Sequence, residues 1–254
     1  MTLTLEQYEQ LSPRCEIQHA GTKMIFATPS VMTRWRVETI YEKEPCTLEW
    51  IAAFQAEDVL VDVGANVGMY TVWAAATRNV KVFAFEPESQ NYALLNRNII
   101  ANGLQGRVRA YCMGLSDTQG LTDLHMTDML IGGSNHSVGE AVDYKLEPSQ
   151  FAYRQGCIVN TLDALVQSQA IPLPTHIKID VDGIEAKVVA GASTILKNTG
   201  VRSLLIETNT NLAEHRGMVH ALTDLGFKYD PAQVHRAMRN DGVFKGVAEH
   251  VFKR

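Results

Sequence analysis

Long apolar runs are missing from this sequence of 254 residues. Asp62 and Asn66 interrupt its most hydrophobic region, so no stretch reaches the roughly 20 apolar residues of a membrane-spanning helix. The first ten residues carry Glu6 and Glu9 and lack the basic-then-apolar pattern of a signal peptide. We therefore expect a cytoplasmic protein with no membrane span.

Cysteine is also scarce, and no C-x-x-C pair occurs among Cys15, Cys46, Cys112 and Cys157. A disulfide-stapled secreted domain would use more cysteines in a shorter chain. A structural zinc site would need clustered ligands. The pattern predicts small buried thiols in a reducing compartment.

An excess of positive charge is absent as well. The chain has 23 Lys and Arg against 28 Asp and Glu, a formal net charge of −5. This balance gives no global electrostatic attraction to nucleic acid. The near-average composition excludes collagen-like, coiled-coil and wholly disordered chains, and no internal repeat or low-complexity tract is present. One elaborated domain or two small ones remain possible at this length.

Short apolar runs alternate with helical patterns along most of the chain. Strands are expected at 59–63, 80–85, 108–113, 177–179 and 203–206, with a final pair near 227–229 and 250–252. Helices are expected at 70–77, 89–101, 161–166, 183–197 and about 213–225, with a further one beginning at an N-cap Thr47. Such alternation is typical of a mainly parallel sheet with helices on both faces. We predict an α/β fold with an open, doubly wound sheet.

Two segments fall outside this alternation. Residues 1–46 mix short polar and apolar pieces and are interpreted as an N-terminal extension or cap on a domain that spans 47–254. Residues from about 120 to 160 are rich in turn formers and show no clear period, which favours a substrate-side insertion over one face. Within it, the run 132–137 could be a mobile lid or an ordinary surface loop.

Acidic residues end four of the five main strands that we expect: Asp62, Glu86, Asp180 and Glu207. In an open α/β sheet, ligands bind at the carboxyl ends of the strands, near the point where the strand order reverses. Several carboxylates at that edge suit a ligand with hydroxyls and a positive charge, and they suit a polyphosphate poorly.

A glycine turn, D-V-G-A-N-V-G, covers residues 62–68. Gly64 and Gly68 permit a tight turn and a close approach of the backbone before the next helix. The turn lacks the Gly-Lys-Ser/Thr ending of a nucleotide-triphosphate loop and the G-x-G-x-x-G dinucleotide pattern. Glu86 ends the next strand, where this type of fold holds ribose hydroxyls with a carboxylate. The combination points to a nucleoside-type cofactor such as S-adenosylmethionine.

Taken together, these motifs resemble the FkbM-type branch of the S-adenosylmethionine-dependent methyltransferases. The resemblance covers about residues 47–230, in the family's order and spacing, through the runs VDVGANVGMY, VFAFEPESQNYALLNRNI, GLSD, TLDAL, IKIDVDGIEAKVVAGA and LLIETN. It implies a Rossmann-like class I methyltransferase sheet, with S-adenosyl-L-methionine as cofactor and S-adenosyl-L-homocysteine as product. It also implies acceptor hydroxyls on sugars or glycans, polyketides and other small molecules.

The resemblance also implies which residues bind the cofactor. Asp62, Gly64, Asn66 and Gly68 would line its methionine part, and Glu86 would bind the ribose with Asn91 close by. Ser116 and Asp117 would lie beside the adenine. The full set of expected cofactor-binding residues is Asp62, Gly64, Ala65, Asn66, Gly68, Glu86, Pro87, Asn91, Ser116, Asp117 and Asp180.

Methyl transfer from a sulfonium is an in-line displacement, so the enzyme chiefly positions the nucleophile and excludes water. Asp180 could orient the acceptor hydroxyl, act as base or hold the cofactor's ammonium. His125 and His136 lie in the insertion and are the histidine candidates for a general base. Glu207 and Asn209 beside Asp180 could hold a divalent cation, so metal dependence stays open.

Other interpretations remain. The enzyme could methylate a nitrogen on a metabolite, peptide or nucleic acid. Nucleic acid is disfavoured by the charge, by the absence of an Asp/Asn-Pro-Pro-Tyr/Phe block and by the absence of a Pro-Cys nucleophile at a strand end. A dehydrogenase and a non-catalytic cofactor-binding module are further alternatives. Trp35, Trp50 and Trp73 are expected to pack in the core.

Overall fold

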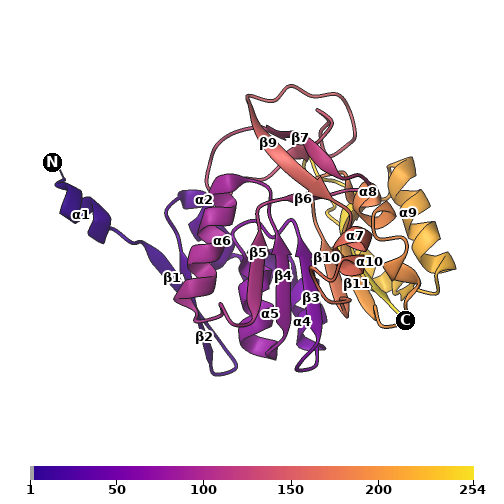
Figure 1. The fold of residues 1–254 in the computed structure, drawn as a ribbon, viewed down its shortest axis with the longest axis horizontal. Helices are drawn as coiled ribbons and strands as arrows, with labels where there is room; N and C mark the ends of the chain where they lie inside the picture. The colour runs from indigo at the N-terminus through magenta and orange to yellow at the C-terminus, as the bar shows by residue number, and fades with distance from the viewer. Residues whose placement is uncertain (1–2) are drawn as a thin grey trace.

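A seven-stranded sheet forms the centre of the molecule, with helices on both faces (Figure 1). The computed structural model describes residues 3–254, so the first two residues of the predicted N-terminal extension lie outside it. The strand order is β12-β13-β11-β10-β3-β4-β5. The bounds are β3 Val59–Val63, β4 Lys81–Phe85, β5 Val108–Tyr111, β10 His176–Ile179, β11 Ser203–Asn209, β12 Lys228–Tyr229 and β13 Val247–Lys253.

The predicted fold class is confirmed. Strands β5, β4, β3, β10 and β11 are mutually parallel, whereas β13 runs antiparallel to both β11 and β12. From β3 the chain moves outward through β4 and β5 and then returns to β10 on the other side of β3. The strand order therefore reverses between β3 and β10, and a ligand site is expected at the carboxyl ends of these two strands.

Two apolar clusters, one on each face, bury the sheet. The first joins the sheet to α4 (Pro45–Ala52), α5 (Met69–Arg78) and α6 (Ser89–Ala101). The second joins it to α7 (Leu162–Gln167), α8 (Glu185–Ala190) and α9 (Ala213–Asp224). A last helix, α10 (Pro231–Ala237), packs against β13. Successive strand residues point to opposite faces, so Leu60 joins the first cluster and Val61 the second.

Two predicted helix boundaries were wrong. Helix α4 begins at Pro45, whose fixed φ suits the first helical position, so Thr47 lies inside the helix. Helix α6 begins at Ser89, as predicted, and its N-cap is Glu88, whose carboxylate accepts from two backbone N–H groups. Helix α8 ends at its C-cap Gly191, and only a short 3-10 turn, Ile195–Lys197, follows where we expected one continuous helix.

Residues after the first helix, α1 (Leu5–Gln10), pack against the main domain. They form a hairpin of β1 (Arg14–His19) and β2 (Thr22–Ala27), then α2 (Val31–Glu38) and α3 (Ile40–Lys43). The β2 backbone donates to the Asn98 and Asn102 side chains of α6, and Phe26 is fully buried. Figure 1 shows α1 projecting away from the body of the molecule.

The 120–160 insertion is more regular than its sequence suggests. Strands β7 (Gly120–Met126) and β9 (Tyr153–Asn160) pair antiparallel, flanked by β6 (Gly114–Leu115) and β8 (Ser137–Val138). This inserted sheet lies beyond the carboxyl ends of the main strands (Figure 1). Its inner face carries Leu124 and Met126, while its outer face carries the exposed pair Leu121 and Ile158. Apolar residues on both faces hide the period of two that marks a strand.

The sequence composition led to two predictions, the absence of a membrane span and four free, buried cysteines. No helix of residues 3–254 is both long enough and apolar enough to span a membrane. All four cysteines are free, as predicted, but only Cys46 and Cys157 are buried, and Cys112 is exposed.

A buried polar network joins the amino-terminal ends of the central strands, opposite the edge that carries the acids. His176 Nδ1 lies 2.7 Å from Ser203 Oγ, and its Nε2 lies 3.0 Å from Asp58 Oδ2. The Trp50 indole donates to the same Ser203 oxygen at 2.8 Å. A Ser-His-Asp hydrolase uses the same residue types, but here the serine is 5% exposed and lines neither cavity described below. We assign this network to holding the strands together.

Replacing Asp58 with alanine should lower the free energy of unfolding by about 2–3 kcal/mol. The substitution removes the acceptor for His176 Nε2 and for the Gln55 backbone N–H. Chemical denaturation measures the loss. The matched control is Asp224→Ala, which removes a 66% exposed carboxylate paired with His220 and should change stability by less than about 0.5 kcal/mol. Equal stability of D58A and the unmodified protein would contradict this role.

Candidate functional site

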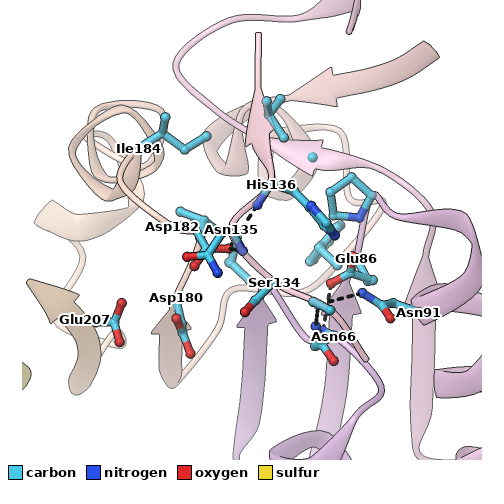
Figure 2. A pocket seen from close by; sticks show the side chains of 18 of the residues that line it. Asn66, Glu86, Asn91, Ser134, Asn135, His136, Asp180, Asp182, Ile184 and Glu207 are labelled. Carbon is cyan, nitrogen blue, oxygen red and sulfur yellow. Dashed lines mark hydrogen bonds between the residues drawn. The ribbon is translucent and has the colours of Figure 1, made fainter. Parts of the chain in front are cut away.

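A cavity of about 410 Å³ lies at the carboxyl ends of the central strands, beneath the inserted sheet (Figure 2). Its floor includes Gly64 after β3, Glu86 after β4, Asp180 after β10 and Glu207 of β11. The strand order reverses at this point, and the volume falls in the range of small-molecule sites. Three of the four predicted strand-end acids therefore meet at one cavity.

The glycine turn brings the ends of β3 and β10 into direct backbone contact. Gly64 has φ +78°, and a Cβ there would stand 1.9 Å from the Asp180 carbonyl oxygen. Only glycine fits both the left-handed backbone and this approach. Two residues later, the Asn66 backbone N–H donates to Glu86 Oε2 at 2.7 Å, which ties the turn to the end of β4.

Glu86 is held by backbone donors on both carboxylate oxygens. Oε2 accepts from Asn66, and Oε1 accepts from the Glu88 N–H at 2.9 Å. The side chain is 5% exposed, and burial raises the pKa of Glu86 to about 7 despite these two hydrogen bonds. Each oxygen retains acceptor capacity, so the group can receive hydroxyl donors from the cavity.

Asp180 is paired with a buried lysine, Lys178, which is not among the site residues predicted from the sequence. Lys178 Nζ lies 2.8 Å from Asp180 Oδ2, and this lysine is 2% exposed. Burial by itself would raise the pKa of Asp180, but the Lys178 and Lys43 ammonium groups outweigh it and hold the pKa below its usual value. Asp180 is consequently an anion at neutral pH.

The fourth strand-end acid, Asp62, faces a neighbouring cavity of about 40 Å³ instead. Its Oδ2 accepts from the Thr71 hydroxyl at 2.5 Å, whereas Oδ1 is buried with no partner among the described residues. Burial raises the pKa of Asp62. Ala65 lines the same small cavity.

The proposed metal ligands are each engaged by another group of the protein. Glu207 is engaged by Arg239 at 2.6 Å, and Asn209 Oδ1 accepts from the Asn211 backbone N–H at 3.1 Å. Within residues 3–254, no group of three or more His, Cys, Asp and Glu side chains is arranged to hold a metal ion. We therefore derive no step through a metal.

Residues 130–136, here called the cover loop, lie over the cavity. The Gly133 carbonyl accepts from the side-chain amides of Asn66 at 2.7 Å and Asn91 at 3.2 Å. Asn91 Oδ1 in turn accepts from the Gly132 N–H at 2.7 Å. These bonds hold the segment over the cavity through residues of the glycine turn and of α6, and its movement as a lid stays a prediction.

Two more anchors hold the cover loop at its ends. The Arg36 Nε donates to the Gly132 carbonyl at 2.7 Å. On the other side of the cavity, Asp182 Oδ2 accepts from the backbone N–H groups of Asn135 at 2.7 Å and His136 at 3.4 Å (Figure 2). The loop thus bridges α2, the glycine turn and the segment after β10.

Replacing Asn91 with alanine should loosen the cover loop, because both of its side-chain bonds to the loop backbone disappear. We expect hydrogen–deuterium exchange at the Gly132 amide to accelerate on the order of tenfold or more. Mass spectrometry of the peptide covering 127–138 measures this. Asn96→Ala on the same helix is the control, because that side chain donates only to Tyr92 of its own helix. Unchanged exchange in N91A would rule out the clamp.

Seven of the predicted site residues line the main cavity: Gly64, Asn66, Glu86, Pro87, Asn91, His136 and Asp180. His136 Nδ1 is buried with no hydrogen-bond partner among the described residues. Figure 2 shows the His136 side chain on the same side of the cavity as Glu86, with Asp180 and Glu207 on the other side.

Four predicted site residues line neither cavity: Gly68, Ser116, Asp117 and His125. Leu124 faces the cavity, so strand alternation turns the adjacent His125 to the other face, where its ring lies near Phe151. Gly68, with φ +83°, begins α5 and packs against Leu95. The Ser116 N–H donates to the Asn160 carbonyl, and the cavity wall at this point is formed by 113–115.

The sequence interpretation missed the contribution of α2 and of the segment before β13. Met32, Trp35 and Arg36 share one helical face at spacings of three and four, and all three line the cavity. Arg239 and Phe244, from the segment before β13, line it as well. The prediction that Trp35 packs in the core was wrong, since it is 43% exposed, whereas Trp50 and Trp73 are buried as expected. The spacing of these residues is visible in the sequence, but a segment interpreted as an extension outside the domain is not expected to line its cavity.

Comparisons with known proteins agree with this fold. A family model for the methyltransferase FkbM domain matches residues 62–229. The hexuronic acid methyltransferase AglP of Haloferax volcanii is 25% identical over 195 residues, which is 76% of this chain and 73% of that protein. Methyltransferase sdnD of Sordaria araneosa is 33% identical over 85 residues, 33% of each chain.

Among solved structures, Aeropyrum pernix fibrillarin with bound S-adenosyl-L-methionine is similar at a TM-score of 0.50 and 9% identity. The match covers 94% of this chain and 82% of that one, and at this identity it shows the fold alone. The family model, by contrast, spans the glycine turn, the strand-end acids and the inserted sheet. On that match, the resemblance seen in the sequence is confirmed, and the protein belongs to the FkbM family of methyltransferases.

Proposed function

We propose that this protein is an S-adenosylmethionine-dependent O-methyltransferase whose acceptor is a hydroxyl of a small molecule, sugar or glycan, or polyketide-type product. The observation that carries the proposal is the pairing of Glu86 with the glycine turn at the reversal of strand order. This arrangement offers a carboxylate for ribose hydroxyls and no grip for a polyphosphate.

The residues around the cavity fit the cofactor. Glu86 would accept from the two ribose hydroxyls, and the apolar side chains of Met113 and Leu115 offer a surface for a flat base. Gly64 allows the cofactor's amino-acid part to approach the backbone between β3 and β10. When bound, S-adenosylmethionine supplies a methyl group activated by its sulfonium.

The rest of the cavity suits an acceptor with both polar and apolar surface. Met32, Trp35 and Phe244 form apolar walls, and Ser134 and Asn135 of the cover loop add polar groups. A sugar ring presents hydroxyls at its edges and C–H groups on its faces, and such a mixed wall would match it. The similar protein AglP is a hexuronic acid methyltransferase, which supports a sugar acceptor.

Asp180 is the group that we propose to contact the acceptor. It stays ionised beside Lys178, so it can accept a hydrogen bond from a hydroxyl or hold the cofactor's ammonium. Proton removal is assigned to Asp180 or His136, the two predicted catalytic residues that line the cavity. They lie on opposite sides of it, so comparing D180N and H136Q will show which one the acceptor meets.

Binding of S-adenosylhomocysteine tests the cofactor. At a concentration of 100 Kd the ligand should stabilise the protein by about 2.7 kcal/mol, a rise in melting temperature of roughly 5–10 °C. No shift with either cofactor form at saturation would refute the proposal. Stabilisation by a nicotinamide dinucleotide instead would establish a dehydrogenase.

Transfer of a labelled methyl group tests the acceptor. The panel should contain sugar and polyketide hydroxyls, matched amines, peptides and RNA. We expect label on the hydroxyl compounds. Label on amines alone would establish the N-methyltransferase, and cofactor binding with no transfer to any acceptor would favour a non-catalytic module.

A further inference from the structure

Arg36 is the cation of the cavity wall whose charge has no partner among the residues that the structure describes. Its Nε donates to the Gly132 carbonyl at 2.7 Å, and among residues 3–254 no carboxylate lies within ion-pair distance of it. The other two cations of the wall are both neutralised. Lys43 pairs with Glu44 at 2.5 Å, and Arg239 pairs with Glu207 at 2.6 Å.

The acids of the cavity are also engaged elsewhere. Asp180 is bound to Lys178, and Asp182 holds the backbone of the cover loop. Glu86 is held by the two backbone N–H groups described above, at the end of β4. Arg36 therefore faces the cavity as an uncompensated positive charge.

The position of Arg36 is as informative as its charge. It lines both the 410 Å³ cavity and the 40 Å³ cavity, the latter shared with Gly64, Ala65 and Asn66. It thus stands where the glycine turn and the cover loop meet. The bond from Nε to Gly132 limits rotation of the guanidinium, and the two Nη groups have no acceptor among the described residues.

A guanidinium held in this way is suited to one ligand chemistry. Its remaining N–H donors form a planar fork that matches the two oxygens of a carboxylate, and charge-assisted bonds of this kind are about twice as strong as neutral ones. We propose that Arg36 binds a carboxylate of the ligand in this cavity. The inference rests on the proposed function, which offers two sources: the amino-acid carboxylate of the cofactor, or the carboxylate of an acidic sugar acceptor.

Isothermal titration calorimetry of the R36Q variant tests the first source. The two probes are S-adenosylhomocysteine and decarboxylated S-adenosylmethionine, which lacks the carboxylate. If the cofactor is the ligand, R36Q should bind S-adenosylhomocysteine about 10- to 100-fold more weakly and bind the decarboxylated probe as the unmodified protein does.

The second source is tested on the protein loaded with S-adenosylhomocysteine, with D-glucuronate and D-glucose as probes. If the acceptor carries the carboxylate that Arg36 binds, R36Q should bind glucuronate about 10- to 100-fold more weakly than the unmodified protein does. Its affinities for glucose and for the cofactor should not change. R36K keeps the charge without the planar fork, so we expect an intermediate loss for whichever carboxylate is bound.

Arg34→Gln is the matched control. Arg34 lies on the same helix, is 61% exposed and pairs only with Glu38, so its loss should alter none of these affinities. Equal losses for the carboxylate-bearing and carboxylate-free probes would overturn the inference, because Arg36 would then act through Gly132. No change with any probe would overturn it as well. If the unmodified protein binds neither cofactor form, the proposed function is refuted together with the inference. If it binds the cofactor and R36Q changes no affinity, only the inference about Arg36 is refuted.

Discussion

Replacing Gly64 with alanine is expected to abolish cofactor binding and to lower the free energy of unfolding by about 3 kcal/mol or more. The new Cβ would stand 1.9 Å from the Asp180 carbonyl oxygen and 2.9 Å from its carbon. No side-chain rotation can relieve a contact between two backbones. The carboxyl ends of β3 and β10 must therefore separate, and the cavity that both strands build must change shape.

A second glycine separates this contact from the cost of the backbone conformation. Gly103 has φ +65°, but a Cβ there meets no atom within 4 Å. Gly103→Ala should therefore cost only about 1–2 kcal/mol and should leave cofactor affinity unchanged. Chemical denaturation and calorimetry with S-adenosylhomocysteine measure both quantities. Cofactor affinity retained in G64A would show that the approach of the two strands is not needed for binding.

Cofactor binding should strengthen as the pH rises through 7, because it requires the ionised form of Glu86. With a pKa of about 7, the carboxylate is mostly protonated at pH 6 and mostly ionised at pH 8. The affinity for S-adenosylhomocysteine should therefore be roughly tenfold weaker at pH 6 than at pH 8. Glu86→Gln should bind the cofactor weakly at both pH values, without this dependence.

A second buried glutamate serves as the control for Glu86. Burial also raises the pKa of Glu249 to about 7, but this residue does not line either cavity. Glu249→Gln should therefore keep the pH dependence of cofactor binding. If E86Q and E249Q both keep it, the carboxylate that binds the ribose is not Glu86.

The raised pKa of Glu86 also has a consequence for the stability of the unliganded protein. Its pKa in the fold, about 7, exceeds the ordinary value of 4.5, so the folded state binds the proton more tightly. Its contribution to stability is fully present below pH 4.5 and is lost as the pH rises through 7, by roughly 3 kcal/mol at most. Denaturation of the unmodified protein and E86Q across this range should show a smaller decline in the variant. An equal decline in the free energy of unfolding of both proteins would contradict this role of Glu86.

Local patterns account for the parts of the fold that were predicted correctly. The strand at 59–63 is delimited by its own β-branched run, and the glycine turn after it by residues that need a left-handed backbone. The predicted ends of the strands place the acidic residues that follow them at one edge of the sheet. A parallel sheet then collects the ends at one edge, so Glu86, Asp180 and Glu207 could be placed together without knowing any contact between them.

Most of the errors and omissions at the site concern relations between distant segments. His125 was a candidate because it lies in the insertion, but its face depends on the pairing of β7 with β9. Trp35 and Arg36 face the cavity because α2 packs beside the cover loop, and Arg36 bonds to Gly132, 96 residues away. The pairing of Lys178 with Asp180 required knowing that the Lys178 side chain is buried.

By itself, the sequence determined the fold class, the family and the strand-end residues that line one part of the cavity, because short-range spacing and turn chemistry encode them. The tertiary structure decided the rest: which face of the inserted sheet meets the cavity, how the cover loop is held, and where a charge is left without a partner. These features depend on contacts between segments that no local pattern specifies, and so they appear only once the chain is folded.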